Sequence, residues 1–238
     1  MNEYCWTLKP IGISYIFKKF KNCRWATYLD SDSMIFKSFS DEYKENFDAI
    51  LTPHRCKIEY FKKIENKVGK FNAGFIAIKN SKNGNKILNF WKKKCLDWCS
   101  DIPDNKRYAD QKYLNDIVKN FKKVQTKPSL GLNLAPWNIA TKEKTLDVSK
   151  DIKKKLSFYH MQGLKIFNKN IYNIYSDDFL VTSEAYQNIY KPYIKLLRNT
   201  YFEIKKNNQN FTIKNELFFD LKLILKKIFL GMKNLKII

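Results

Sequence analysis

The stretch Trp25-Ala26-Thr27-Tyr28-Leu29-Asp30-Ser31-Asp32 decides how the rest of the chain is interpreted. Apolar and aromatic residues follow one another there without polar alternation, which is typical of a buried parallel strand. In open α/β sheets, side chains just beyond the carboxyl ends of the strands form the ligand-binding edge. Two carboxylates at that edge, with Ser31 between them, predict a site for a divalent cation that also holds phosphate oxygens. An isolated Asp-x-Asp also occurs in many solvated turns, so this interpretation depends on the rest of the chain.

The composition is that of a globular protein with a strong positive charge. The 238 residues, 44% of them hydrophobic and 16% aromatic, can bury a sizeable core in one domain with an appendage. The formal net charge of +22 favours polyanions such as nucleic acids, anionic membranes or phosphorylated substrates. Only four of the 45 basic residues are arginine, and lysine lacks the planar fork that reads bases. A nucleic-acid partner is therefore not expected.

The cysteines and the apolar runs bear on the compartment. Cys95 and Cys99 lie four residues apart, which is neither a zinc-knuckle spacing nor a redox Cys-x-x-Cys spacing, so reduced thiols in a cytosolic protein are expected. Glu3, Lys9 and Pro10 interrupt any apolar stretch that could serve as a signal peptide. No uncharged run is long enough to predict a membrane span.

Strands and helices alternate along most of the chain, which predicts an α/β fold. Expected strands are 25–29, 49–52, 71–78, 124–126 and 156–160, and expected helices are 4–20, 85–99 and 110–121. Residues 55–70 are charged and weakly patterned, so a loop that can include a helical turn is expected there. Helical patterns return after about residue 183, and the last helix, roughly 216–235, is basic and amphipathic. Such a helix is typical of an anionic membrane surface, and equally of a helix packed on the domain with its lysines in water.

Polar or small residues occupy four motifs in a fixed order: Asp30-Ser-Asp32, Phe71-Asn72-Ala73-Gly74, Asp110-Gln111 and His160-Met-Gln-Gly163-Leu-Lys165. Together these motifs resemble the GT-A-fold glycosyltransferases that use nucleotide-diphospho-sugars. The bacterial glycogenin/galactosyltransferase-like group, similar to glycosyltransferase family 8, is the best match. The resemblance extends from the first residues to about residue 167. It implies a Rossmann-like mixed sheet flanked by helices.

The resemblance also implies a metal and phosphate site. Asp30, Asp32 and His160 would hold Mn²⁺ or Mg²⁺ on the diphosphate of the donor. Lys165 would add a cation to the same oxygens, with Gly163 in the same motif. The lysine stands one residue earlier than in the commoner pattern of the family.

The remaining motifs would serve the transferred sugar. Asn72 and Gly74 would lie beside the sugar, while Asp110 and Gln111 would hydrogen-bond its hydroxyls or stabilise positive charge at its anomeric carbon. Structural roles remain open as well, because Asp110 could cap a helix and Asn72 with Gly74 could form a bend. His54, which belongs to no motif, is expected to be structural.

One departure from the family concerns the start of the fold. Only 29 residues precede Asp30, whereas the family places a β-α-β unit before its Asp-x-Asp strand. The first strands of the sheet are therefore expected to be missing. The chain could be truncated, another polypeptide could supply that half, or the chain could be a remnant that no longer catalyses.

The resulting prediction is an N-terminally incomplete glycosyltransferase region over residues 1–180, followed by a helical extension over 181–238. The enzyme would move a hexose from a nucleoside diphosphate sugar, with UDP-sugars the first choice, to a glycan or lipid-linked acceptor of the lipopolysaccharide or capsule type. The alternative is a non-catalytic basic protein, a remnant of such an enzyme that binds a membrane or polyanion. The expected location is the cytoplasm, and the basic last helix leaves a peripheral position on the inner face of the membrane open.

Overall fold

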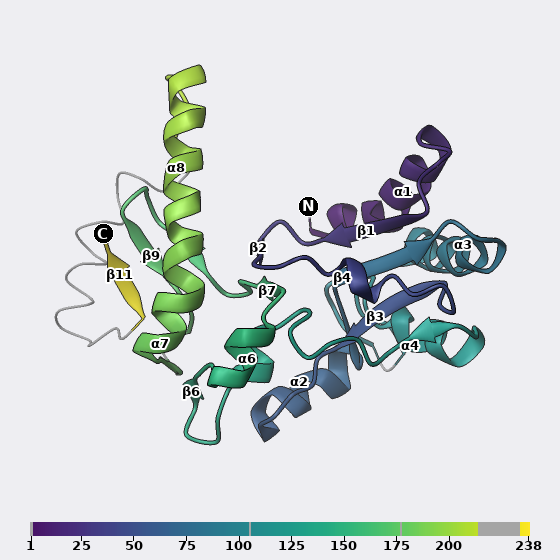
Figure 1. Ribbon diagram of the computed structural model, residues 1–238, viewed down its shortest axis with the longest axis horizontal. Helices are drawn as coiled ribbons and strands as arrows, with labels where there is room; N and C mark the ends of the chain where they lie inside the picture. Colours follow the sequence, from purple (N-terminus) through teal and green to yellow (C-terminus); the bar gives the residue numbers. More distant parts are fainter. Residues whose placement is uncertain (1, 105, 177, 214–233) are drawn as a thin grey trace. The chain divides into compact units, whose positions relative to one another are not determined.

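The computed structural model describes residues 2–104, 106–176, 178–213 and 234–238 (Figure 1). The chain forms two compact units, Met1–Asn138 with Lys155–His160, and Ile139–Lys154 with Met161–Ile238. The sequence predicts a division of the chain by function, into a glycosyltransferase region up to residue 180 and an extension after it. These compact units do not test that division, which stays a prediction.

The first unit is built on a four-stranded mixed sheet with the strand order β1-β4-β3-β5. Its strands are β1 (Trp25–Leu29), β3 (Ala49–Pro53), β4 (Phe71–Lys79) and β5 (Val124–Gln125). Strand β4 pairs antiparallel with both β1 and β3, and β5 pairs parallel with β3. The prediction of a buried parallel strand at β1 was therefore wrong in direction, and Tyr28 and Leu29 are only partly buried. An uninterrupted apolar run reveals neither the direction of the neighbouring strand nor a position at the edge of the sheet.

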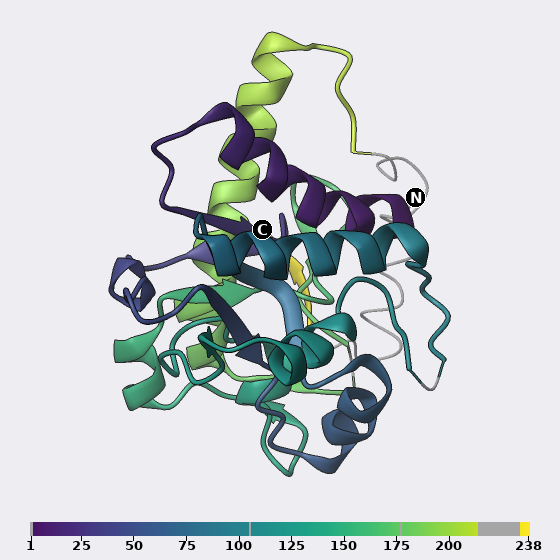
Figure 2. The ribbon, with the colours of Figure 1, turned by 90° about the vertical axis from the view of Figure 1, so that its right-hand side faces the viewer.

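Helices flank this sheet, as the sequence predicted. Helices α1 (Asn2–Lys19) and α3 (Lys82–Asp97) lie side by side (Figure 2), and α4 (Tyr113–Asn120) packs against α3 and β4. Their apolar side chains share one core with residues of the sheet: Ile13, Phe17, Leu51, Ile76, Ile78, Ile87, Trp91, Leu114 and Ile117. A second cluster contains Ile50, Phe75, Ala77, Leu132 and Phe158. Because both clusters draw on β4, this strand is buried from Phe71 to Ile78.

Residues 59–68 form helix α2 (Glu59–Val68), which is longer than the single helical turn that the expected loop allowed. Phe61 is the buried residue of this helix, and Ile64 and Val68 follow it at helical spacing. The segment therefore carries an amphipathic signal, although charged residues make up half of it.

A small ladder next to the sheet determines where the site forms. Strand β2 (Ser33–Ile35) pairs antiparallel with β7 (Phe158–His160), and Ser33 lies opposite His160. The residues that directly follow Asp32 are therefore bound to the strand that ends in His160. This pairing joins two motifs that are far apart in the sequence.

The second unit contains two small sheets and a long helix. A three-stranded sheet has the order β11-β9-β8, and β10 pairs parallel with β6. The other elements of the described residues, in chain order, are η1 (Ser40–Glu42), α5 (Pro136–Ile139), β6 (Thr145–Leu146), α6 (Lys150–Lys155), β8 (Lys165–Ile166), β9 (Ile171–Asn173), β10 (Leu180–Val181), α7 (Ser183–Ala185), a π-helical turn (Tyr186–Tyr190), α8 (Lys191–Asn207) and β11 (Leu235–Ile237). The helix α8 confirms the helical extension.

The last helix expected from the sequence falls on residues 214–233, outside the described residues, and Leu235 at its far end begins β11. Within the described part of the chain, no helix combines the length and the apolar character that a membrane crossing requires.

Candidate functional site

Asp30, Asp32 and His160 come together at the end of β1. The backbone N–H of Asp30 donates to the carbonyl of Gly74, which keeps the chain beside β4 as it leaves the strand. Nε2 of His160 lies 3.1 Å from Oδ1 of Asp32 and 3.8 Å from Oδ2 of Asp30. One ligand atom from each of the three residues fits within a span of 4.8 Å. The structure therefore assembles the three residues that the sequence proposed as metal ligands.

The charge state of this cluster suits a cation. Burial by itself would raise the pKa of the Asp32 carboxyl, but the hydrogen bond and charge of His160 outweigh it and lower that pKa below its ordinary value. His160 is buried, while the Asp32 side chain is about half exposed, at 51%. The buried imidazole and the more exposed carboxylates converge on one point. This set of donor atoms fits Mn²⁺ or Mg²⁺.

A buried lysine that the sequence analysis did not single out reaches the same cluster. Nζ of Lys9, from α1, lies 3.1 Å from Oδ1 of Asp30 and 3.2 Å from Oδ2 of Asp110. It also donates to the carbonyl of Ala73 and lies 4.9 Å from the centre of the Tyr28 ring. Burial by itself would lower the pKa of Lys9, but the two carboxylates raise it above its ordinary value. Lys9 is thus a fixed cation within the site.

Asp110 is a partner of Lys9 and does not cap a helix. Helix α4 begins only at Tyr113, and the residue before it, Lys112, makes no capping hydrogen bond. The Asp110 side chain is almost completely buried, and its backbone carbonyl accepts a hydrogen bond from Nε1 of Trp91. Burial raises the pKa of Asp110 to about 6, although Lys9 acts in the opposite direction. The carboxyl group therefore titrates far closer to neutrality than an exposed aspartate.

Asn72 and Gln111 belong to a chain of hydrogen-bonded amides along β4. Nδ2 of Asn72 donates to Oε1 of Gln111 at 3.1 Å, and the same oxygen accepts from the backbone N–H of Ala73. Oδ1 of Asn72 accepts from the backbone N–H of Gly74 at 2.9 Å and from Nδ2 of Asn133 at 3.1 Å. These bonds fix the backbone of β4 where its pairing with β3 changes register.

Gly74 provides the space that His160 occupies. A Cβ atom at this position would lie 2.6 Å from Nδ1 of His160 and 2.7 Å from Oδ1 of Asn72. The opposite wall is Trp137, whose ring packs edge-on against both His160 and His54 at centroid distances of 5.5 and 5.3 Å. The imidazole is held between a glycine backbone and an indole ring, so its orientation toward the two aspartates is fixed by packing.

Gly163 and Lys165 belong to the second unit. Gly163 adopts a φ of +87° in the turn after His160, and the exposed Lys165 begins β8. Their assignment to the donor phosphates stays a prediction.

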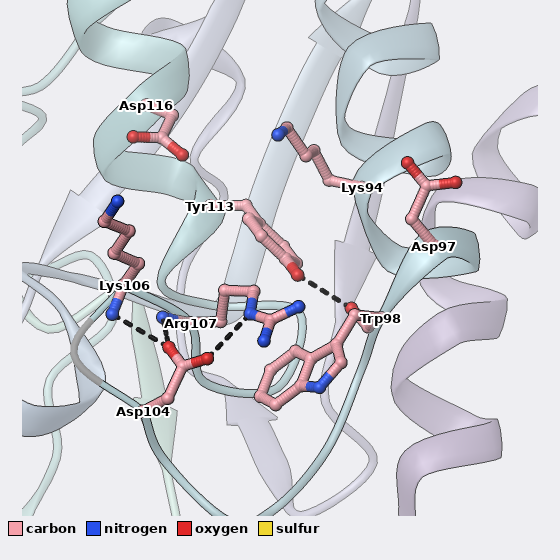
Figure 3. A pocket seen from close by; sticks show the side chains of 8 residues that line it. All are labelled: Lys94, Asp97, Trp98, Asp104, Lys106, Arg107, Tyr113 and Asp116. Atoms are coloured by element: carbon pink, nitrogen blue, oxygen red, sulfur yellow. Dashed lines mark hydrogen bonds and ion pairs between the residues drawn. The ribbon is translucent and has the colours of Figure 1, made fainter.

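A cavity of about 760 Å³ also opens on the first unit (Figure 3). Its walls combine three cations, three carboxylates and two aromatic side chains: Lys94, Lys106, Arg107, Asp97, Asp104, Asp116, Trp98 and Tyr113. The guanidinium of Arg107 lies 4.4 Å from the centre of the Trp98 ring and pairs with Asp104. Asp30, Asp32 and His160 do not line this cavity. Its charges balance, so it lacks the excess of one sign expected of a diphosphate or cation site.

Two proteins of Bacillus subtilis (strain 168) are related to the chain along most of its length. It is 30% identical to the uncharacterized protein YfnD over 213 residues, which cover 86% of this chain and 67% of YfnD. It is 27% identical to the uncharacterized protein YfnF over 200 residues, which cover 78% of this chain and 66% of YfnF. The chain therefore spans about two thirds of the length of each relative.

No protein-family model matches the chain. Among solved structures, it is similar to the crystal structure of a glycosyltransferase involved in the glycosylation of the major capsid of PBCV-1. The TM-score is 0.48 and the sequence identity 15%, with 68% of this chain and 72% of the other covered. At that level the likeness assigns neither fold nor activity. The 30% identity to YfnD, over 67% of its length, shows the relationship, and the chain belongs to the YfnD family.

Proposed function

We propose that the chain is a metal-dependent glycosyltransferase region of the GT-A type, similar to glycosyltransferase family 8. The observation that carries this proposal is the cluster of Asp30, Asp32 and His160, whose ligand atoms lie within 4.8 Å of one another. The order of the four sequence motifs supports it independently of the geometry. A bound Mn²⁺ or Mg²⁺ would neutralise the charge that builds on a departing nucleoside diphosphate.

The residues of the chain have distinct tasks in this proposal. Asp30, Asp32 and His160 hold the metal, and Lys9 fixes the Asp30 carboxylate through its 3.1 Å contact. Asp110 and Gln111 lie next to the transferred sugar, where Asp110 can hold a proton or a negative charge near neutral pH. Asn72 and Gly74 shape the floor beneath it, and Lys165 with Gly163 adds contacts to the phosphates.

The donor and acceptor follow from the resemblance. The donor is a nucleoside diphosphate sugar, first of all a UDP-hexose, and the acceptor is a surface glycan of the lipopolysaccharide or capsule type, free or linked to a lipid. A cytoplasmic site at the inner face of the membrane fits such an acceptor.

The proposal also concerns the open edge of the sheet in the first unit. In the described residues β1 stands at the edge of the sheet, with β4 as its only neighbour there. Four of its five residues, Trp25, Thr27, Tyr28 and Leu29, are only partly buried. An apolar edge strand of this kind is a natural place for further strands to pair. Such strands, from the same or another polypeptide, complete the donor site.

Thermal unfolding with and without ligands tests the metal site. The midpoint is measured with Mn²⁺ alone, with UDP, GDP or CDP alone, and with each pair. A ligand at about 100 times its Kd adds roughly 2.7 kcal/mol to the free energy of unfolding. We expect a shift that requires both Mn²⁺ and one nucleotide, because Asp30, Asp32 and His160 would hold the metal that neutralises the diphosphate.

The Asp32→Asn variant removes one ligand charge and is expected to abolish that shift. Asp151→Asn is the matched control, since Asp151 is exposed on α6 in the second unit. A shift that survives Asp32→Asn would contradict the metal assignment. The absence of a metal-dependent shift with all three nucleotides would favour a non-catalytic remnant or a region that binds its donor only with the further strands in place.

A further inference from the structure

Helix α8 is the long helix of the second unit (Figure 1). Most of the residues that line a cavity of about 390 Å³ come from this helix. Its lining combines three cations with apolar side chains, and no acidic residue takes part in it. The cations are Lys191, Lys195 and Arg198, and the apolar residues include Ile194, Phe202 and Ile238. This excess of positive charge differs from the cavity in the first unit, where the positive and negative side chains of the lining are equal in number.

The cations share one side of the helix. Lys191, Lys195 and Arg198 follow one another at helical spacing, so their side chains project over the same surface. Among the described residues, no carboxylate lies within 4.0 Å of any of the three. Nε of Arg198 is buried without a hydrogen-bond partner, while its Nη2 donates to Oδ1 of Asn170. Within the described part of the protein, Lys191 and Arg198 therefore donate to side-chain amides, those of Gln187 and Asn170, and not to carboxylates.

Further cations surround the same apolar floor. Nζ of Lys236 lies 5.0 Å from the centre of the Tyr186 ring, and Nζ of Lys169 lies 6.0 Å from that of Phe202. Phe202 is 48% exposed and Ile238 44% exposed, whereas Ile194 is buried beneath them. Exposed apolar side chains next to the lysine and arginine side chains of α8 suit a ligand with an anionic head and an apolar tail.

We propose that this cavity binds an anionic phospholipid at a bilayer surface. The phosphate lies on Lys191, Lys195 and Arg198, and the start of the acyl chain lies on Ile194, Phe202 and Ile238. The site goes beyond the proposed transferase activity, and it depends on neither the metal cluster nor the donor.

Vesicle sedimentation with matched charge variants tests the site. The full chain is mixed with phosphatidylcholine vesicles, with or without phosphatidylglycerol. The variant Lys191→Gln/Lys195→Gln removes two charges from the cavity. The control Lys150→Gln/Lys153→Gln removes two exposed charges from α6 in the same unit. Affinity for phosphatidylglycerol vesicles should fall about tenfold or more in the cavity variant and far less in the control, because each lysine at the membrane contributes separately.

A second pair of variants tests the apolar floor. Phe202→Ser is expected to weaken binding to phosphatidylglycerol vesicles without changing the charge, whereas Ile102→Ser, at an exposed loop position of the first unit, is expected to leave it unchanged. Circular dichroism verifies that each variant is folded.

Equal losses of vesicle affinity in the cavity variant and the control variant would overturn the proposal, since they would show that binding depends on net charge alone. The proposal would also be overturned if the chain bound inorganic phosphate in solution but did not sediment with phosphatidylglycerol vesicles. That result would assign the cations to a soluble anion. The thermal shift with Mn²⁺ and nucleotide should persist in the cavity variant, so a failure here is distinct from a failure of the transferase proposal.

Discussion

Nζ of Lys9 lies 3.1 Å from Oδ1 of Asp30, and the lysine side chain is only 4% exposed. The same ammonium group lies 3.2 Å from the buried Asp110. One cation thus orients a carboxylate of the metal cluster and compensates a second carboxylate that has no access to water. The stability of the first unit and the geometry of its site therefore depend on the same side chain.

Replacing Lys9 by Met should destabilise the chain by about 3–5 kcal/mol at neutral pH, because Asp110 would remain buried without its counter-charge. The double variant Lys9→Met/Asp110→Asn should recover a large part of this loss, since it removes the uncompensated charge. Urea unfolding of the three proteins measures both effects.

Lys18→Met is the control for this change. Lys18 is exposed in the last turn of the same helix, so its replacement is expected to change stability by less than about 0.5 kcal/mol. Equal effects of the two substitutions, or the absence of any recovery in the double variant, would contradict the role of the buried ion pair.

The sequence was sufficient to propose Asp30 and Asp32, because they follow an apolar run. The resemblance to GT-A glycosyltransferases added His160 as the third ligand. It could not show the β2–β7 ladder that brings them together, since pairing between distant three-residue strands leaves no local pattern. Lys9 did carry a signal. Its spacing from Ile13 and Phe17 places it on the buried face of α1, where a lysine requires a partner. Its partners Asp30 and Asp110 are distant in sequence, and only the fold identifies them.

Gly74→Ala should weaken Mn²⁺ binding and lower the free energy of unfolding by about 1–3 kcal/mol, because the new methyl group would displace His160 or Asn72. Isothermal titration with Mn²⁺ and urea unfolding measure the two effects. Gly12→Ala is the matched control. No atom lies within 4 Å of the Cβ that it would add, and alanine in the middle of α1 should stabilise the chain by up to about 1 kcal/mol. Unchanged Mn²⁺ affinity in Gly74→Ala would refute the packing of His160 on this glycine.

The stability of the chain should depend on the titration of His54. Burial lowers the pKa of this imidazole to about 4, although Nδ1 is bonded to the carbonyl of Lys70. The unfolded chain, with an ordinary histidine pKa near 6.5, therefore binds more protons between these two values. The contribution of neutral His54 is complete above about pH 6.5, and up to about 3 kcal/mol is lost as the pH falls to about 4.

His54→Asn keeps a donor near the position of Nδ1 but does not titrate. The free energy of unfolding of this variant should fall less steeply than that of the parent chain between about pH 7 and about pH 5. The comparison between the two proteins is essential, because Asp110 acts in the opposite sense. Its pKa is raised to about 6, so its protonation favours the folded state as the pH falls. Parallel curves for the two proteins would show that His54 is not buried in its neutral form.

Replacing Arg55 by lysine should destabilise the chain, although both side chains carry one positive charge. Its guanidinium donates to four backbone carbonyls, those of Ser129, Leu130, Leu132 and Asn133, and so closes the loop that presents Asn133 to Asn72. A lysine ammonium has no planar fork to span these carbonyls, so some of them would lose their donor. We expect Arg55→Lys to reduce the free energy of unfolding by about 2 kcal/mol in urea. Arg24→Lys, at a side chain that is 71% exposed, should change it by less than about 0.5 kcal/mol. If the two substitutions had the same effect, the charge of Arg55 and not the shape of its guanidinium would hold this loop. The position of Asn133 would then depend on its hydrogen bond to Asn72.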